Sequence, residues 1–405
     1  MNEQPMHRVS SRLAAITPSQ TMAVDVKSKE LIAQGEPVIN FAPGEPNFDT
    51  PDNIVEAAVA AVKNPASYKY TPVAGLLPLR EAIIEYTGQF GALDVTAANN
   101  ALVTNGGKQA IYQSCAAIID PGNEVLLPAP YWTTFPETIK LAGGVPVPVE
   151  ASVEQGYKVT VDQLEAARTE NTIAMVFCSP SNPSGAVYSA EEVTAIGQWA
   201  LEHGIWIIAD EIYNRLVYTG EKPLPIYQAV PEVANQTIAT NGVAKAYAMT
   251  GWRVGWMVGP TDVIKAATAL QSHLTSNVNN VAQRASIEAL TGPQDTVAEM
   301  LEIFNERREI IVSMLNEIEV FDVPDPQGAF YVLPSVEKAL GKNIAGRVAN
   351  TSAELANIIL EEALVAVVPG EAFGSPGTLR LSYALSTEDI IEGATRLQAL
   401  FGDIS

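Results

Sequence analysis

The segment from Asn241 to Gly255 reads Asn-Gly-Val-Ala-Lys-Ala-Tyr-Ala-Met-Thr-Gly-Trp-Arg-Val-Gly. It follows the alternating apolar and polar residues of positions 236–240, a pattern that predicts a strand. Lys245 therefore lies near a strand end among small and apolar neighbours, where partial loss of solvent makes an amine a better nucleophile. Arg253 lies between two glycines that let a backbone approach closely, which suits a phosphate group. A lone lysine is more often a solvated surface charge, so these neighbours are what single it out.

Strand and helix patterns alternate from about residue 100 to residue 260. This alternation predicts a mainly parallel sheet with ligand-binding loops at the carboxyl ends of its strands. The run Thr172–Phe177 is almost wholly apolar, as expected for a strand covered on both faces. A second apolar run, at 205–209, ends in Asp210. A carboxylate there is costly without a cation or hydrogen-bond donors, so we expect a cationic ligand at Asp210; a metal site or a helix cap is the alternative.

Composition limits the class of protein. The 405 residues are 47% hydrophobic with a formal net charge of −22, enough chain for two domains. The acidic balance disfavours nucleic acid and anionic membranes as partners, because both need clustered Lys and Arg. We find no apolar run that would span a membrane and no signal-peptide pattern, so we expect a cytoplasmic protein. Cys115 and Cys178 lie in apolar surroundings and are expected to be free buried thiols rather than catalytic groups.

The segment around Lys245 resembles the cofactor-lysine segment of the class I aminotransferases, which are fold type I enzymes of pyridoxal phosphate (PLP). The run to Gly255 is similar to the bacterial aspartate aminotransferase branch, subgroup I-beta. An amine that binds PLP covalently and an arginine for its phosphate are what such a site needs. Many relatives carry Ser immediately before the lysine; this chain has Ala244, so other groups must replace one hydroxyl near the phosphate. The resemblance extends from about Ile39 to Ala384.

The resemblance implies a fold type I α/β architecture. A large domain holds a mainly parallel seven-stranded sheet between helices, and a smaller domain is α+β. Residues 1–48 would form an N-terminal arm and part of the small domain, residues 49–295 the large PLP-binding domain, and residues 296–405 the small C-terminal domain. The pattern of residues 297–318 predicts a long helix that bridges the two domains, with Met300, Phe304 and Arg308 along one face.

The same resemblance implies a set of cofactor ligands. Lys245 would hold PLP and move a proton, Asp210 would pair with the ring nitrogen, and Arg253 would bind the phosphate. The other implied ligands are Gly107, Lys108 and Gln109 at a helix N-terminus that cradles the phosphate, Trp132 over the ring, Asn182 and Tyr213 at the ring oxygen, and Tyr70 from a neighbouring subunit. Taken alone, these residues have simpler explanations: a tight turn at Gly107, packing for Trp132 and Tyr70, and a turn for Asn182.

Substrate ligands are implied as well. The backbone N–H of Gly44 would meet the substrate carboxylate, with Trp132 and Asn182 also in contact with substrate. Arg380, in an Arg-Leu-Ser setting, would form a bidentate pair with the α-carboxylate, although a strand arginine is more often half-exposed. Lys108 would take the second carboxylate of an acidic substrate; the alternative is an exposed lysine at a helix start.

We therefore expect a PLP-dependent aminotransferase that moves an amino group between L-aspartate, or another amino acid, and 2-oxoglutarate, giving oxaloacetate and L-glutamate. PLP is the expected cofactor, without a metal, and the expected assembly is a homodimer with shared active sites. The alternatives are an aromatic or prephenate aminotransferase, a PLP-dependent carbon–sulfur lyase, and a PLP-binding regulator. Thr17 stands where prephenate-using relatives often have a basic residue, which argues against prephenate. A regulator would need a DNA-binding domain, for which the chain has no room or basic patch.

Overall fold

The centre of the molecule is a seven-stranded sheet in the order β2-β8-β7-β6-β5-β3-β4. The computed structural model describes residues 9–18, 20–220 and 223–402. Neighbouring strands are parallel except where β8 pairs with β2 and β7. The strands are β2 (Ala101–Thr104), β3 (Glu124–Ala129), β4 (Val145–Glu150), β5 (Thr172–Cys178), β6 (Trp206–Asp210), β7 (Thr237–Gly242) and β8 (Gly255–Val258). The predicted mainly parallel sheet is confirmed.

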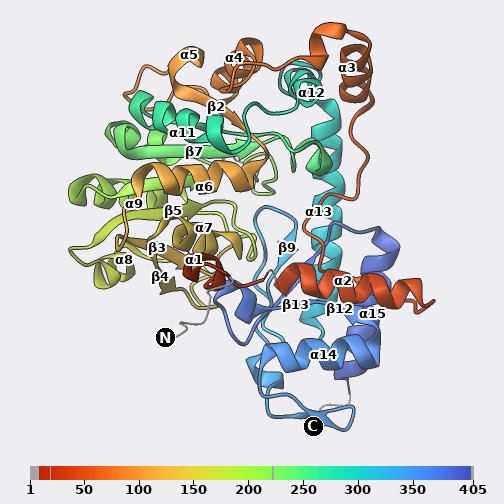
Figure 1. Ribbon diagram of the computed structural model, residues 1–405. Helices are drawn as coiled ribbons and strands as arrows, with labels where there is room; N and C mark the ends of the chain where they lie inside the picture. Colours follow the sequence, from red (N-terminus) through yellow and green to blue (C-terminus); the bar gives the residue numbers. More distant parts are fainter. Residues whose placement is uncertain (1–8, 19, 221–222, 403–405) are drawn as a thin grey trace, which may run out of the picture.

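Helices cover both faces of this sheet (Figure 1). Alternate residues of a strand point to opposite faces, so in β5 Val176 packs in one layer while Met175 and Phe177 pack in the other. One layer contains α6 (Gly107–Ile118), α7 (Thr134–Ala142) and α11 (Thr261–Leu274). The other contains α3 (Asp52–Lys63), α4 (Leu77–Thr87), α8 (Val161–Ala167), α9 (Ala190–His203) and α12 (Asn280–Thr291).

A second hydrophobic core surrounds smaller sheets, as predicted for an α+β domain. Three antiparallel strands have the order β13-β14-β9, and β1 pairs in parallel with β12. The bounds are β1 (Ile39–Asn40), β9 (Tyr331–Val332), β12 (Val365–Ala366), β13 (Val368–Pro369) and β14 (Leu379–Ser382), with helices α2 (Gln20–Ala33), α14 (Ser352–Ala363) and α15 (Thr387–Phe401). A short hairpin joins β10 (Asn343–Ile344) to β11 (Arg347–Val348).

Helix α13 (Asp295–Asn316) connects the two cores and crosses the molecule between them (Figure 1). Val297 and Met300 belong to the core of the large sheet, whereas Phe304 and Ile311 belong to the second core. The predicted long helix is therefore present, beginning and ending two residues earlier than expected. The domain boundaries after residues 48 and 295 stay predictions, and residues 1–8 and 19 of the predicted N-terminal arm lie outside the described residues.

The sequence analysis named Arg308 on the same face as Phe304 and did not name the preceding Arg307. Arg307 is the more buried of the two arginines, at only 8% exposed. Arg308 instead forms an ion pair with Asp325 at the edge of the second core. Helical spacing allows either position, because residues three and four apart both share a face with Phe304.

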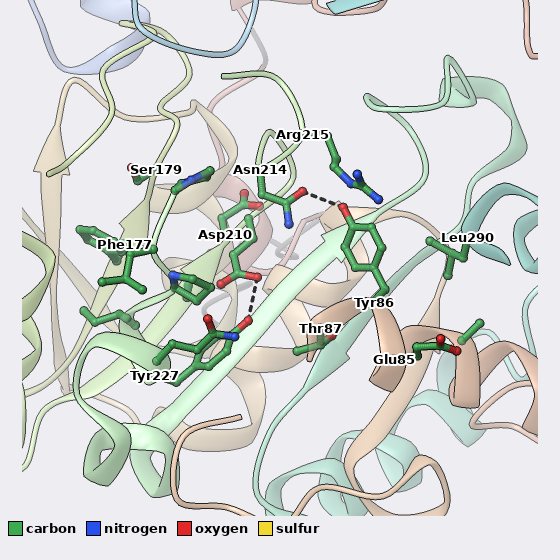
Figure 2. A pocket seen from close by; sticks show the side chains of 18 of the residues that line it. Glu85, Tyr86, Thr87, Phe177, Ser179, Asp210, Asn214, Arg215, Tyr227 and Leu290 are labelled. Carbon is green, nitrogen blue, oxygen red and sulfur yellow. Dashed lines mark hydrogen bonds between the residues drawn. The ribbon is translucent and has the colours of Figure 1, made fainter. Parts of the chain in front are cut away.

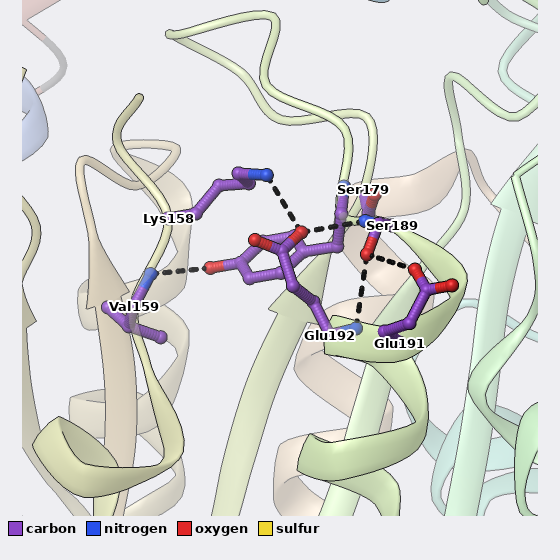
Figure 3. A network of polar contacts seen from close by, with 7 residues as sticks. Lys158, Val159, Ser179, Ser189, Glu191 and Glu192 are labelled. Atoms are coloured by element: carbon purple, nitrogen blue, oxygen red, sulfur yellow. Dashed lines mark hydrogen bonds and ion pairs between the residues drawn. The ribbon is translucent and has the colours of Figure 1, made fainter. Parts of the chain in front are cut away.

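The loop between β5 and α9, which carries Asn182, is held by a network of polar contacts (Figure 3). Ser189 caps α9: its hydroxyl accepts the backbone N–H of Glu192 at 3.2 Å, and the Glu192 carboxylate accepts the backbone N–H of Ser189 at 2.7 Å. Lys158 forms an ion pair with the same carboxylate at 2.7 Å. Such a capping box stabilises a helix start by about 1 kcal/mol, so the far end of the Asn182 loop has a fixed position.

None of the helices in the described part of the chain combines the length and the apolar composition needed to cross a membrane.

Candidate active site

A cavity of about 320 Å³ lies where β5, β6 and β7 end, as expected for ligand sites of parallel sheets. Its walls contain every predicted cofactor and substrate residue except Gln109 and Tyr70. The predicted residues that line it are Gly44, Gly107, Lys108, Trp132, Asn182, Asp210, Tyr213, Lys245, Arg253 and Arg380. Residues separated by more than 300 positions in the chain thus meet in one place.

The Lys245 amine is partly buried in this cavity, between the rings of Tyr213 and Phe330 at 5.9 and 5.8 Å. Its Nζ donates a hydrogen bond to the backbone carbonyl of Gly44. Burial lowers the pKa of Lys245 from 10.5 to about 8, while the carboxylate of Glu45 acts in the opposite direction. A substantial fraction of the amine is therefore unprotonated near neutral pH, as a nucleophile toward an aldehyde must be.

Asp210 is the last residue of β6, and its side chain is buried. Its Oδ1 accepts one hydrogen bond, from the backbone N–H of Ile212 at 3.2 Å. Burial raises the pKa of Asp210 to about 7, although Lys245 pulls it down. A carboxyl group held this way gains its charged form only when a cation lies beside it, and a protonated pyridine nitrogen is such a cation.

Close backbone packing brings Arg253 against the N-terminus of α6. A Cβ atom on Gly106 would lie 2.5 Å from Nη2 of Arg253, and one on Gly255 would lie 2.6 Å from the backbone of Gly106 and 2.7 Å from that of Gly107. Only glycine fits at these two positions. A guanidinium beside the free N–H groups of a helix N-terminus makes a site for a phosphate.

Arg380 lies at the centre of β14 and is only 2% exposed. Its guanidinium donates to the carbonyl of Ala42 at 2.5 Å and to Oδ1 of Asn182 at 3.1 Å, and its Nε has no hydrogen-bond partner. It forms no ion pair with any acidic residue of the described chain. A buried charge of this kind requires an anion, so the alternative of a half-exposed strand arginine is excluded and the site favours a carboxylate ligand.

Lys108 and Trp132 lie together on the wall of the cavity, with Nζ of Lys108 5.4 Å from the centre of the indole. The indole contacts Phe135 edge to face at 5.5 Å, which fixes its orientation. Lys108 is exposed and forms no ion pair within the described chain, and partial burial and the nearby Arg253 lower the pKa of its amine.

Gln109 and Tyr70 lie outside the cavity. The Gln109 side chain accepts the backbone N–H of Asn105 at 2.6 Å and donates to Thr275 at 2.8 Å, so any role at the phosphate belongs to its position in the first turn of α6. Tyr70 is 90% exposed in the single chain. Its predicted role in a second subunit stays a prediction.

Several lining residues were not predicted. Tyr331 donates or accepts a hydrogen bond with Tyr213 at 2.9 Å, and a Cβ on Gly44 would lie 2.9 Å from its hydroxyl. Glu45 and Cys178 also line the cavity, and burial raises the pKa of the Cys178 thiol well above its usual range. Tyr331 belongs to β9, and its sequence does not show which face of that strand meets the site.

A second, larger cavity of about 570 Å³ lies on the other side of Asp210 (Figure 2). It contains Glu211, whose carboxyl accepts the hydroxyl of Tyr227 at 3.1 Å and whose pKa burial raises to about 8. The one cation among its described lining residues, Arg215, lies over the ring of Tyr86 at 5.3 Å. With no lysine among its described lining residues, this cavity does not fit PLP, whereas the amine, carboxyl, phosphate cradle and unpaired arginine of the smaller cavity do.

The comparisons with known proteins agree with this geometry. The family model described as aminotransferase class I and II matches residues 36–397. This chain belongs to that family. It is an aminotransferase, and PLP is the cofactor of these enzymes.

Individual relatives align over nearly their whole length. A protein of Streptomyces avermitilis named aspartate aminotransferase is 58% identical, over 98% of this chain and 97% of the relative. A protein of Cereibacter sphaeroides named aspartate/prephenate aminotransferase is 44% identical, over 98% of this chain and 99% of the relative. The solved structure of the aspartate aminotransferase of Thermus thermophilus with maleate has a TM-score of 0.90 and 38% identity, covering 98% of this chain and 100% of that chain.

We predict that PLP attaches to the apoenzyme of this aminotransferase faster as the pH rises through about 8, because the unprotonated Lys245 amine is the nucleophile and its pKa is about 8. Stopped-flow absorbance of PLP mixed with apoenzyme measures the rate. Glu45→Gln should move the midpoint to lower pH, since Glu45 raises the pKa of Lys245. Glu85→Gln, in the larger cavity, is the control and should leave it in place. A midpoint near the ordinary lysine value of 10.5 contradicts the prediction.

Proposed function

We propose that this aminotransferase moves the amino group of L-aspartate to 2-oxoglutarate, giving oxaloacetate and L-glutamate. The observation that carries the proposal is Arg380, a buried guanidinium without an acidic partner in the same cavity as the Lys245 amine. The α-carboxylate of an amino acid substrate would supply the anionic partner that Arg380 does not have within the described chain. Lys108 supplies a second cation for a second carboxylate. The name of the Streptomyces relative, at 58% identity, points to the same substrate.

Each main residue of the cavity has a separate role in amino transfer. PLP, when bound, supplies an aldehyde that combines with amines and a ring that absorbs electrons. Lys245 would hold PLP, and its freed amine would remove the proton from the α-carbon of the amino donor and, in the second half-reaction, supply the proton to the α-carbon of the acceptor. Asp210 keeps the ring nitrogen protonated, Arg253 and the N-terminus of α6 hold the phosphate, and Arg380 orients the α-carboxylate.

The remaining ligands add orientation. Asn182 and Tyr213 reach the ring oxygen, and Trp132 covers the ring. Asn182 also bonds to Arg380 at 3.1 Å, so one side chain links the cofactor and the carboxylate site. The backbone N–H of Gly44 completes the carboxylate site.

Prephenate is the second candidate substrate, because relatives named aspartate/prephenate aminotransferase are up to 44% identical. Thr17 stands where prephenate-using relatives often have a basic residue. Its backbone N–H donates a hydrogen bond to the carboxylate of Glu137 at 3.0 Å. The negative charge of Glu137 disfavours a substrate carboxylate at this position, so we propose aspartate ahead of prephenate as the substrate. Membership of subgroup I-beta and a cytoplasmic location are part of the same proposal.

The proposal predicts rapid formation of oxaloacetate from aspartate and 2-oxoglutarate, and its loss in Lys245→Ala, since Lys245 is the amine assigned to carry the proton. A coupled assay with malate dehydrogenase measures oxaloacetate, and the absorbance of dialysed protein shows whether PLP stays bound. Lys158→Ala, outside the cavity, is the control. Turnover of aspartate in Lys245→Ala near the wild-type rate would reject Lys245 as the proton carrier. Release of pyruvate and ammonia from a cysteine conjugate, without oxaloacetate formation, would support a lyase instead.

Lys108→Ala should lower kcat/KM for aspartate by about ten- to a hundredfold, because a charged hydrogen bond contributes about 1.5–3 kcal/mol. The rate with phenylalanine, which has no second carboxylate, should change little. Lys140→Ala is a matched control, since Lys140 pairs with Glu137 at 3.0 Å. Equal losses of kcat/KM for aspartate and phenylalanine, or no loss for either, would show that Lys108 does not bind the second carboxylate.

A homodimer with shared active sites is supported by an apolar surface. Helix α3 buries Ile54 and Ala58 against the molecule, while a neighbouring face of the helix exposes Val55, Val59 and Val62. The exposed Tyr70 follows this helix in the chain. A face of this kind beside a predicted intersubunit ligand is typical of a contact between subunits.

We therefore predict that Val59→Glu converts a dimer into monomers, because it places a charge in the apolar contact. Sedimentation velocity measures the mass, and activity should fall as protein is diluted. Val348→Glu is the control, since Val348 is 53% exposed and Val59 48%. A wild-type chain that sediments as a fully active monomer would exclude shared sites.

A further inference from the structure

The loop 42–50 crosses the mouth of the active site and touches its two main cations. The carbonyl of Ala42 accepts Nη2 of Arg380 at 2.5 Å, and the carbonyl of Gly44 accepts Nζ of Lys245. Backbone oxygens of one short loop therefore orient both the carboxylate-binding arginine and the cofactor-binding lysine. Whatever fixes this loop also fixes those two side chains.

The side of the loop that faces away from the cavity is held by Arg307 of α13. Nη1 of Arg307 donates to Oδ1 of Asn47 at 2.7 Å. The same guanidinium lies over the ring of Phe48, 5.1 Å from its centre. Phe48 in turn contacts Phe304, one turn earlier on α13, edge to face at 5.1 Å. One side chain thus holds two consecutive residues of the loop.

The burial of Arg307 is costly and needs an explanation. The residue is only 8% exposed, its Nε has no hydrogen-bond partner, and it forms no ion pair within the described chain. Burial lowers the pKa of its guanidinium, with only remote help from Glu388 and Glu306. An apolar side chain would satisfy the packing of α13 at lower cost. A planar guanidinium, however, can donate to an amide and stack on a ring at once, which neither lysine nor an apolar residue does.

The position of Arg307 on α13 attaches one end of the loop 42–50 to a helix that contributes to both cores. This helix begins in the core of the large sheet and continues into the second core (Figure 1). The loop 42–50 is fixed at its other end to the large sheet side, where the Thr50 hydroxyl donates to the carbonyl of Ala248 at 2.8 Å. A shift of α13 relative to that sheet therefore moves one end of the loop against the other.

We propose that Arg307 is a positioning residue for substrate binding, which fixes the loop 42–50 so that the carbonyl of Ala42 holds Arg380 in place. Arg307 does not touch the substrate: it acts through Asn47 and Phe48. The inference rests on the proposed function, because it assigns the same cavity to a substrate carboxylate.

The test uses the holoenzyme and maleate, a dicarboxylate that binds without reacting. Arg307→Met should weaken maleate binding, measured by calorimetry, by about tenfold, since the loop loses a charged hydrogen bond. KM for aspartate should rise by a similar factor, with a smaller change in kcat. Arg308→Met is the control, because Arg308 is the adjacent arginine of α13 and pairs with Asp325 instead. Unchanged maleate binding in a folded Arg307→Met enzyme would overturn the proposal.

A double-mutant cycle separates positioning from general damage. Asn47→Ala should weaken maleate binding as Arg307→Met does, and the double variant should be no weaker than either. Arg307→Lys should recover part of the loss. If Arg307→Met does not fold, Asn47→Ala alone decides, and wild-type binding in that variant would overturn the proposal. If the losses of maleate affinity in Arg307→Met and Asn47→Ala add up in the double variant, the proposal is overturned as well. Failure of the wild-type enzyme to use aspartate would instead reject the proposed substrate, while the cycle still reports on the loop through thermal unfolding.

Discussion

The balance of charge in one cavity governs much of this structure. The chain carries a formal net charge of −22, yet Lys108, Lys245, Arg253 and Arg380 line a single cavity of about 320 Å³. Like charges in a partly buried space repel. Burial is the main cause that lowers the pKa of Lys245 to about 8, and the nearby Arg380 and Arg253 lower it further. Anionic ligands relieve this repulsion. A phosphate, an α-carboxylate and a second carboxylate would each meet one of the three cations that carry no covalent role.

The sheet explains how such a cluster forms from distant parts of the chain. Parallel strands bring their carboxyl ends to one edge, so Cys178 and Asp210 are register neighbours there, and Lys245 follows the next strand. The antiparallel β8 then returns the chain so that Gly255 packs against the start of α6. Local sequence rules locate each of these strand ends. Only the tertiary packing of the second core supplies Arg380, which is why composition and periodicity alone leave its role open.

Local signals predicted the parallel sheet and the residues Asp210, Lys245 and Arg253: apolar strands that end near a charged residue, and glycines beside an arginine. The other cavity residues were predicted through the resemblance to the class I aminotransferases. The residues that were not predicted lack such signals. Tyr331 is one aromatic in an apolar strand, and its approach to Gly44 depends on the contact between two cores. Arg307 was not singled out, because an arginine buried without an acidic partner is uncommon and nothing in its local sequence marks it. Tyr70 cannot be judged from one chain, since its proposed contact needs a second copy.

Acidic residues at the same cavity limit how strongly it attracts anions. Glu45 and Asp25 line it together with the four cations. Glu45 raises the pKa of Lys245, so it keeps the amine from losing its proton too readily, and it accepts the Thr250 hydroxyl at 2.9 Å, which holds it near the lysine. The same carboxylate repels a substrate dianion. This repulsion helps a site that must release a dicarboxylate after every half-reaction. An interaction that is equally strong in the ground state and the transition state slows product release and does not accelerate the chemical step. The mixed charge of the walls therefore suits turnover better than a purely cationic cavity would.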